Sequence, residues 1–321
     1  MTTGLRSARV TRRIRRAEGV IGLTLSGVDG ALPSWTPGAH IDVLLPSGQC
    51  RQYSLCGPVT SRDYEIAVRV DPNGRGGSRE VHEALRPDTT VTISEPRNRF
   101  ALERAQSYLF VAGGIGITPL LPMVEAVDAL GLDWQLVYCG RTRASMPFRD
   151  ELEMYSDRVR LWPDDERGVV DVPGIVRAAV AARPDVAIYT CGPGPLIDAM
   201  KAAVCAAGAA PLRFERFTAA PEMNPTVPQG TSGFEVQLGV DGPVLAVGEK
   251  QSVLQAVLDA GADVLYSCEE GTCGSCQTTV LDGVVDHRDD LLSDAERADR
   301  QMLICVSRCA GDRLVLDIPA P

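Results

Sequence analysis

Four cysteines in the carboxy-terminal part of the sequence constrain this chain more than any other feature. Cys268, Cys273 and Cys276 follow one another with four and then two residues between them, and Cys305 follows after a long gap. This spacing is one of those in which four thiolates hold a [2Fe–2S] cluster. The sequence therefore predicts an iron–sulfur cluster with these four cysteines as its ligands.

The loop between the first three cysteines has a composition that suits such a cluster. Gly271 and Gly274 permit a left-handed backbone, in which a Cβ atom would clash. Thr272 and Ser275 are small, so backbone N–H groups of the loop have room to point at the cluster sulfurs and influence the reduction potential. We expect this loop to wrap closely around the cluster.

Other uses of these cysteines fit the spacing less well. A structural zinc site normally shows two short pairs of Cys or His, and disulfides suit secreted proteins, whereas no secretory signal is visible. Cys309 competes with Cys305 for the fourth ligand position. We expect Cys305, because the apolar run 302–304 should bring the chain back under the cluster, which leaves Cys309 as a spare thiol.

Residues 231–321 resemble the plant-type ferredoxins, on the strength of the four-cysteine pattern. The resemblance implies an α+β domain of the β-grasp type. This segment holds 16 acidic and 6 basic residues, whereas residues 1–230 hold equal numbers of each, so the net charge of −10 falls on it entirely. The acidic excess either keeps the domain soluble or guides its encounter with a basic partner.

Length and composition predict an ordinary multidomain protein. With 321 residues the chain exceeds the roughly 250–300 residues beyond which a single core rarely grows. No stretch approaches the roughly 18 apolar residues of a membrane helix. The arginine cluster at 12–16 could suggest nucleic acid, but a charged strand edge is commoner and the chain is acidic. We expect a cytoplasmic monomer that binds neither membrane nor nucleic acid.

Residues 1–103 have the pattern of a small antiparallel β-barrel. Strand-like alternation with frequent turn signals runs from Arg9 to about Pro96, and helical periodicity is almost absent. The segment 51–54 places a cation and an aromatic ring on one face of a strand. The glycine-rich loop 71–78 runs into a helical stretch, so its free N–H groups could bind a phosphate.

Residues 104–220 have the pattern of a doubly wound α/β domain with a parallel sheet. An apolar strand at 107–112 leads into the glycine-rich turn 113–119 and an amphipathic helix, which lets a dinucleotide pyrophosphate approach a helix N-terminus. Two further strand ends, at 139–142 and 190–193, share this register. Ligands of such sheets bind beyond the carboxyl ends of the strands, where all three segments fall.

These segments resemble the ferredoxin–NADP reductase superfamily, and specifically its phthalate dioxygenase reductase branch. The matching motifs are RQYS at 51–54, GRGGS at 74–78, GGIGITP at 113–119 and CGP at 191–193. Together with the cysteine pattern, they extend the resemblance over essentially the whole chain, in the order flavin, nicotinamide, cluster. The proline-rich segment 221–230 is then a linker that lets the cluster domain reposition.

The resemblance implies which residues hold the flavin. The isoalloxazine ring would be lined by the RQYS segment and the neighbouring strand, and the phosphate would be held by the glycine-rich loop. These residues are Arg51, Gln52, Tyr53 and Ser54, then Val68 and Arg69, then Gly76, Gly77 and Ser78. We expect FMN, because the loop supplies a terminal phosphate site and no aromatic platform for an adenine is evident. Phe217 looks like the aromatic residue that covers the flavin, with a core residue at the domain end as the alternative, and His40 is expected to be structural.

The resemblance also implies a nicotinamide site. Thr118 would contact flavin and nicotinamide, and Cys191 would orient hydride transfer from close to the reacting carbon without acting as a nucleophile. The nucleotide would also contact Gly114, Gly116, Pro119, Arg141, Thr142, Arg143, Gly192 and Pro193.

Cofactor choice stays open at this stage. NADH-preferring members of this branch carry an acidic residue after the position of Arg141, and a carboxylate there repels a 2′-phosphate. This chain instead has Thr142 and Arg143, a hydroxyl and a guanidinium that would accept one. The resemblance favours NADH over NADPH.

The expected function is electron transfer from NAD(P)H through FMN to the [2Fe–2S] cluster. The flavin accepts a two-electron hydride and releases single electrons, which is what a cluster accepts. By the resemblance, the electrons then pass to a separate terminal oxygenase, either a Rieske-type enzyme or a cytochrome P450. A reductase of the same architecture with FAD, and a redox-sensing iron–sulfur flavoprotein, are the alternatives.

Overall fold

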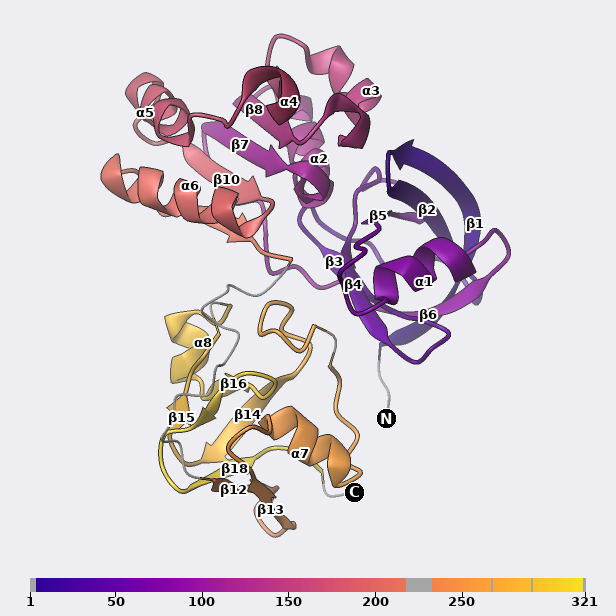
Figure 1. Cartoon of the computed structure of the whole chain (residues 1–321), viewed down its shortest axis with the longest axis vertical. Helices are drawn as coiled ribbons and strands as arrows, with labels where there is room; N and C mark the ends of the chain where they lie inside the picture. Colours follow the sequence, from indigo (N-terminus) through magenta and orange to yellow (C-terminus); the bar gives the residue numbers. More distant parts are fainter. Residues whose placement is uncertain (1–3, 218–232, 267, 290, 320–321) are drawn as a thin grey trace. The chain divides into compact units, whose positions relative to one another are not determined.

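The chain divides into two units, Met1–Arg216 and Phe217–Pro321 (Figure 1). The computed structural model describes residues 4–217, 233–266, 268–289 and 291–319. The predicted linker at 221–230 lies outside the described residues. The predicted domain limits remain predictions, but the three predicted architectures are present.

The first part of unit 1 is a six-stranded antiparallel sheet in the order β4-β3-β6-β1-β2-β5. A bridge between Leu55 and Ile66 joins its two end strands, which confirms the predicted barrel. One face of each strand packs into a core that includes Val10, Leu23 and Ile41. The elements are β1 (Leu5–Ala17), β2 (Val20–Gly27), β3 (His40–Leu44), β4 (Cys50–Ser54), β5 (Tyr64–Arg69), α1 (Gly77–Ala84) and β6 (Thr90–Ser94).

The second part of unit 1 is a five-stranded sheet in the order β11-β10-β7-β8-β9, in which every pair of neighbours is parallel. Its strands are β7 (Ser107–Gly113), β8 (Asp133–Gly140), β9 (Val159–Pro163), β10 (Ala187–Cys191) and β11 (Arg213–Glu215). Its helices are α2 (Ile117–Ala129), α3 (Arg149–Leu152), α4 (Asp164–Arg167), α5 (Val172–Ala182) and α6 (Gly194–Ala206), with the 3₁₀ turns η1 (Gly114–Gly116), η2 (Arg143–Ser145) and η3 (Glu153–Tyr155).

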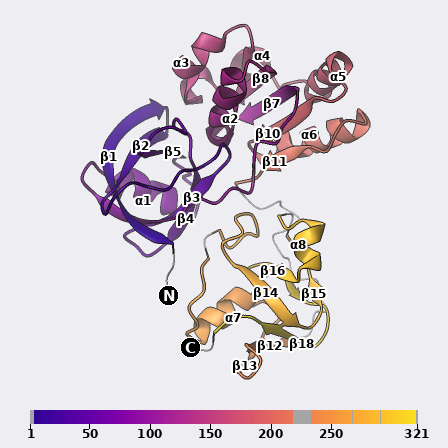
Figure 2. The same ribbon diagram turned by 180° about the vertical axis from the view of Figure 1, so that it is seen from behind.

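Helices cover both faces of this parallel sheet, as predicted. Phe110 of β7 packs into a core shared with α2, whereas its neighbours Leu109 and Val111 pack with residues of α5 and α6 (Figures 1 and 2). Because side chains alternate along a strand, these cores lie on opposite faces. The strand order reverses between β7 and β10, and ligands of doubly wound sheets bind in the crevice at such a point.

Arg16 on β1 connects the barrel to the parallel-sheet domain within unit 1. Its guanidinium forms an ion pair with Glu65 at 3.1 Å and a second one with Glu151 of α3, and it lies 4.8 Å from the ring centre of Phe148. A half-buried cation with two carboxylates and an aromatic face is better fixed than an isolated surface pair. The arginine cluster at the start of the chain is therefore partly structural.

Unit 2 is built on a mixed five-stranded sheet in the order β13-β12-β18-β14-β16, in which only β12 and β18 run parallel among these pairs. The elements are β12 (Phe234–Leu238), β13 (Val244–Val247), α7 (Val253–Asp259), β14 (Gln277–Asp282), β15 (Val285–Asp286), α8 (Asp294–Ala298), β16 (Gln301–Leu303), β17 (Arg308–Cys309) and β18 (Arg313–Leu316). This mixed sheet confirms the predicted α+β ferredoxin domain. Among the described parts of the chain, no helix is long and apolar enough to cross a membrane.

Candidate functional site

Two glycine-bearing strand ends meet at the crevice of the parallel sheet. A Cβ atom on Gly116 would lie 2.2 Å from the carbonyl oxygen of Cys191, and one on Gly113 would lie 2.6 Å from Cδ of Pro193. No other residue could replace these glycines without moving the backbone of the opposite turn. The structure therefore brings together the two turns that the sequence assigned to the nucleotide.

Helix α2 begins at this junction, with Thr118 and Pro119 in its first turn. Thr118 is buried and its hydroxyl donates to the carbonyl oxygen of Ile115 at 2.9 Å, while Gly114 has a left-handed backbone with φ of 55°. No side chain caps the start of this helix. Helix α2 continues from η1, and the N–H of Ile117 already donates to the carbonyl oxygens of Gly114 and Ile115, so the N–H groups that could serve a bound anion are those at the start of η1.

The end of β8 carries Thr142 and Arg143 on an ordered turn. Thr142 and Ser145 exchange reciprocal side-chain to backbone hydrogen bonds at 3.2 Å. The Arg143 guanidinium donates to both carboxylate oxygens of Glu166, from Nε at 2.7 Å and from Nη2 at 3.0 Å. Sequence reasoning treated Arg143 as a cation open to a phosphate and missed this partner.

The RQYS segment on β4 faces the glycine-rich loop. A Cβ atom on Gly77 would lie 2.4 Å from Nε of Arg51, so this guanidinium lies directly over the start of α1. Gly76 precedes the helix with φ of 90°, and no side chain caps the helix. The Ser78 hydroxyl accepts from the backbone N–H of Asp71 at 3.0 Å. A cation, a glycine turn and a helix N-terminus thus converge.

The other predicted flavin residues lie on neighbouring strands. Tyr53 packs against the barrel core, and burial raises the pKa of its hydroxyl, so the phenol stays protonated. Val68 is buried and its carbonyl oxygen contacts Nε2 of His82 at 2.9 Å, whereas Arg69 is exposed. Gln52 is half-buried, and Phe217 is 41% exposed.

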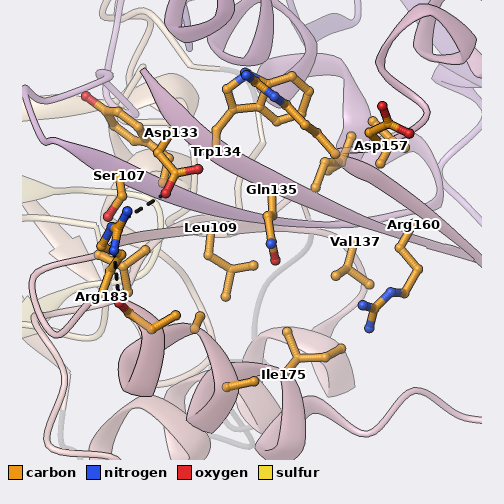
Figure 3. A pocket seen from close by; sticks show the side chains of 18 of the residues that line it. Ser107, Leu109, Asp133, Trp134, Gln135, Val137, Asp157, Arg160, Ile175 and Arg183 are labelled. Atoms are coloured by element: carbon orange, nitrogen blue, oxygen red, sulfur yellow. Dashed lines mark hydrogen bonds and ion pairs between the residues drawn. The ribbon is translucent and has the colours of Figure 1, made fainter. Parts of the chain in front are cut away.

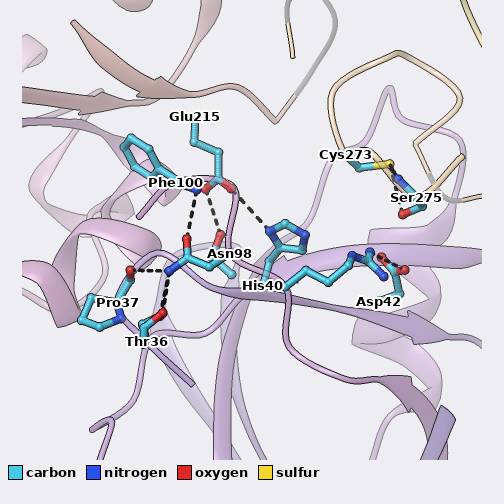
Figure 4. Close-up of polar contacts among 11 residues, drawn as sticks. Thr36, Pro37, His40, Asp42, Asn98, Phe100, Glu215, Cys273 and Ser275 are labelled. Atoms are coloured by element: carbon cyan, nitrogen blue, oxygen red, sulfur yellow. Dashed lines mark hydrogen bonds and ion pairs between the residues drawn. The ribbon is translucent and has the colours of Figure 1, made fainter. Parts of the chain in front are cut away.

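Glu215, at the end of β11, is a buried carboxyl group that sequence reasoning missed. Ser54 donates a hydrogen bond to its Oε2 at 3.3 Å, and Nδ1 of His40 lies 3.8 Å from its Oε1 (Figure 4). His40 and Ser54 pair across β3 and β4, and Glu215 pairs with Cys191 across β10 and β11. The carboxyl group therefore links the predicted flavin strand to the predicted nicotinamide turn.

Burial sets the protonation of this group. It raises the pKa of Glu215 to about 8, while burial, with Arg97 and Arg99 nearby, lowers the pKa of His40 to about 3. Burial likewise raises the pKa of Cys191 well above its ordinary value. At neutral pH the site therefore holds a protonated carboxyl, a neutral imidazole and a neutral thiol.

A cavity of about 670 Å³ lies on another part of the parallel sheet, between strands β7–β9 and helix α5 (Figure 3). Leu109, Gln135 and Val137 line it from the sheet and Ile175 lines it from the helix. Of the predicted nucleotide residues only Arg143 borders it. The cavity therefore does not coincide with the crevice described above.

In unit 2 the loop of the first three cysteines directs backbone N–H groups at sulfur atoms. The N–H groups of Glu270 and Thr272 donate to Sγ of Cys268 at 3.3 and 3.4 Å. The N–H group of Ser275 donates to Sγ of Cys273 at 3.4 Å, and Figure 4 shows these two residues side by side. Gly271 and Gly274 have φ of 70° and 75°. A Cβ atom on Gly271 would lie 2.7 Å from Cγ2 of Val306, so the turn requires glycine.

The four predicted ligand sulfurs are neighbours in this structure. Cys268 has Cys273 and Cys305 as side-chain hydrogen-bond partners, which lower the pKa of its thiol, and Cys305 also contacts Cys276. Among the described residues, no three His, Cys, Asp or Glu side chains are placed so that together they could hold a metal ion. The four neighbouring thiols are nevertheless the donor set that a [2Fe–2S] cluster requires, so these residues fit the cluster by their chemistry.

Cys309 lies apart from this hydrogen-bonded set, as far as the described residues show. It belongs to β17, which pairs with β15, and its Sγ accepts from the N–H of Gly311 at 3.3 Å. Cys305 instead lies two residues after the end of β16 and is buried, as Cys273 and Cys276 are. The geometry thus favours Cys305 over Cys309 as the fourth ligand.

Comparisons with known proteins agree with both halves of this description. Residues 239–310 match the model of the 2Fe-2S iron–sulfur cluster binding domain, and residues 110–202 match that of the oxidoreductase NAD-binding domain. The putative toluene-4-sulfonate monooxygenase system reductase subunit of Comamonas testosteroni is 40% identical over 309 residues, which is 94% of this chain and 95% of that protein.

Solved structures extend the likeness to the whole chain. Phthalate dioxygenase reductase is 34% identical with a TM-score of 0.71, and the match covers 98% of both chains. An intact type IV self-sufficient cytochrome P450 monooxygenase is 39% identical with a TM-score of 0.85. That match covers 97% of this chain but 41% of the P450 protein, so this chain corresponds to part of it.

A barrel, a nucleotide-binding sheet and a four-cysteine ferredoxin domain define an NAD(P)H-dependent flavin and iron–sulfur reductase. The chain belongs to the phthalate dioxygenase reductase-like family, within the ferredoxin–NADP reductase superfamily. It is the reductase component of an oxygenase system, which transfers electrons from NAD(P)H through a flavin and a [2Fe–2S] cluster to the oxygenase.

Cys305→Ser should remove the cluster and leave NAD(P)H-to-ferricyanide activity largely intact, because ferricyanide can take electrons from the flavin. Cys309→Ser is the matched control and should retain the cluster. Iron content and the visible absorbance of the cluster provide the measurement. Loss of iron in Cys309→Ser but not in Cys305→Ser would show that the ligand assignment is wrong.

Glu215 should make unit 1 less stable as pH rises from 6 to 8. The ordinary pKa of 4.5 is raised to about 8, so in this window the folded chain holds a proton that the unfolded chain releases. Rising pH then disfavours folding by up to about 1.4 kcal/mol per pH unit, until the folded pKa is passed. Between pH 6 and pH 8 the free energy of unfolding of Glu215→Gln should fall by about 2 kcal/mol less than that of the wild type.

All three tryptophans belong to unit 1, so urea denaturation followed by tryptophan fluorescence measures this effect. Glu83→Gln, which changes an exposed carboxylate, is the control. Equal pH slopes in wild type and Glu215→Gln would contradict the assignment of a raised pKa.

Proposed function

We propose that this reductase uses FMN and NADH and delivers single electrons from its cluster to the terminal oxygenase of its own system. The flavin supplies the conversion from two-electron to one-electron transfer when it is bound. The observation that carries the proposal is the position of the Arg51 guanidinium over Gly77, at the start of α1. This position is a phosphate site on the barrel.

FMN fits this site because its terminal phosphate can bind there. A flavin without such a contact would be held mainly through its ring. The resemblance assigned Arg51 to the isoalloxazine ring, but its contact with Gly77 favours the phosphate instead. Arg51 adds a fixed positive charge to the free N–H groups and the positive dipole end of α1. Tyr53 and Ser54, further along the same strand, are then left for the ring.

The polar cluster around Glu215 has a proton-holding role in this proposal. Glu215 keeps its proton at neutral pH and fixes the Ser54 hydroxyl, which the family motif places beside the flavin ring. The main-chain carbonyl of Cys191 lies against Gly116 and burial keeps its thiol neutral, so Cys191 shapes the nicotinamide pocket and does not act as a nucleophile. Thr118 is held by Ile115 on the other side of the same junction.

NADH is the proposed nucleotide because Arg143 is already paired. A guanidinium that donates to both oxygens of Glu166 is not open to a 2′-phosphate. Asp164 and Asp165 precede Glu166, so three carboxylates follow β9 directly. These charges oppose a further phosphate at this edge of the sheet.

The cluster loop is the proposed exit for electrons. Leu265 and Tyr266, just before the first ligand, are 62% and 37% exposed, and Glu269 is exposed inside the loop. An apolar centre with acidic surroundings suits a partner that presents a basic surface around its own metal centre. We propose a Rieske-type oxygenase as this partner, with a cytochrome P450 as the other candidate.

Released flavin should be FMN by mass spectrometry. Arg51→Met should weaken FMN binding to the apoprotein about ten- to hundredfold, because it removes a charge-assisted hydrogen bond to the phosphate. Riboflavin, which has no phosphate, should bind wild type and variant equally. Fluorescence titration measures both ligands, and Arg62→Met at an exposed site is the control. Release of FAD, or equal losses for FMN and riboflavin, would contradict the phosphate site.

Electrostatic docking should make acceptor reduction fall with salt, because screening lengths shrink from about 10 Å at 0.1 M to about 3 Å at 1 M. Ferricyanide reduction by the flavin should change much less, because it needs no docked partner protein. Glu269→Gln/Glu270→Gln should slow acceptor reduction at low salt, whereas the equally charged control Asp241→Asn/Glu249→Gln should not. A salt-independent acceptor rate that the first pair leaves unchanged would refute electrostatic docking.

A further inference from the structure

We propose that Glu166 is the residue that selects NADH, by keeping the Arg143 guanidinium engaged and by presenting its own carboxylate at the ribose end of the nucleotide site. This inference rests on the NADH-dependent function proposed above and identifies the residue responsible for the preference. In the motif, the position expected to carry the acid is Thr142. The acid instead comes from the helix after the next strand.

Arg143 and Glu166 form a bidentate ion pair. Nε and Nη2 of Arg143 donate to Oε1 and Oε2 of Glu166 at 2.7 and 3.0 Å, so both oxygens are engaged. Two parallel bonds fix the plane of the guanidinium as well as its charge. Both side chains are 44% exposed, so the pair lies where a ligand can reach it.

The sheet places this pair at the ribose end of the site. In doubly wound domains the ribose is read at the end of the second strand, and β8 is the strand that follows the glycine-rich turn. Gly140 at the end of β8 pairs with Pro163 at the end of β9. The N–H of Asp165 donates to the carbonyl oxygen of Arg141 at 3.1 Å, which ties α4 to the segment that carries Arg143.

The rigid turn that carries Arg143 strengthens its ion pair with Glu166. Thr142 and Ser145 cap each other around Arg143, so the backbone from which the guanidinium extends is held in one conformation. A 2′-phosphate that sought Arg143 would have to displace Glu166 and then lie beside it. A 2′-hydroxyl makes no such demand, because it can donate a hydrogen bond to a carboxylate.

The decisive experiment measures binding rather than turnover. Adenosine 2′,5′-bisphosphate and 5′-AMP are titrated by calorimetry into the holoprotein as wild type, Glu166→Gln, Arg143→Gln and the double variant. Glu166→Gln should tighten bisphosphate binding about tenfold, because Arg143 is released, and should weaken 5′-AMP binding, because an amide oxygen accepts a hydrogen bond from the 2′-hydroxyl less strongly than a carboxylate. The double variant should lose this gain. Glu153→Gln, an exposed carboxylate of the same domain, is the control and should behave as wild type.

Steady-state kinetics with ferricyanide provide the second readout. In Glu166→Gln the ratio of kcat/KM for NADPH to that for NADH should rise about tenfold, and a wild-type midpoint of urea denaturation shows that the variant is folded. Unchanged bisphosphate affinity in Glu166→Gln overturns the inference, as does a tenfold loss of bisphosphate affinity in Arg143→Gln alone. Failure of the proposed function looks different, because wild type would then show neither NADH oxidation nor binding of 5′-AMP.

Discussion

The close approach of Gly116 to the carbonyl of Cys191 is the contact on which the nucleotide half of this reductase depends. A single added carbon at Gly116 would stand 2.2 Å from that oxygen. The contact brings two turns from the ends of β7 and β10 to one crevice and sets the turn before α2 against the main chain of Cys191. The packing of these two turns therefore determines the shape of the nucleotide pocket, and the side chains around it determine its charge and protonation.

The cluster domain and the fold class could be predicted because their signals are local in the sequence. Spacing between Cys268, Cys273 and Cys276 is a property of one loop, and the N–H groups of Thr272 and Ser275 do lie near ligand sulfurs as expected. Alternation in the barrel strands and glycine-rich turns after parallel strands are equally local. Such signals survive without any knowledge of tertiary contacts.

Residues whose role depends on a distant partner could not be found in this way. Glu215 becomes a buried acid beside Ser54 only because β11 pairs with β10, and nothing in the run FERF marks it. His40 acquires its low pKa from the same burial and not from its neighbours in sequence. The sequence indicated a free cation at Arg143, because its partner Glu166 lies on α4, which follows a different strand.

The same distinction applies to the charge of the cluster domain. A count of acidic residues treats each as a surface charge, but Asp289 is buried and accepts from the N–H groups of Leu291 and Leu292 at 3.2 and 2.8 Å. Asp286 forms an ion pair with Arg288 at 2.7 Å. Such carboxylates stabilise the turn that packs against the cluster loop and contribute little to a docking field. Partner attraction must therefore rest on the acids that stay exposed, of which Glu269 lies inside the ligand loop itself.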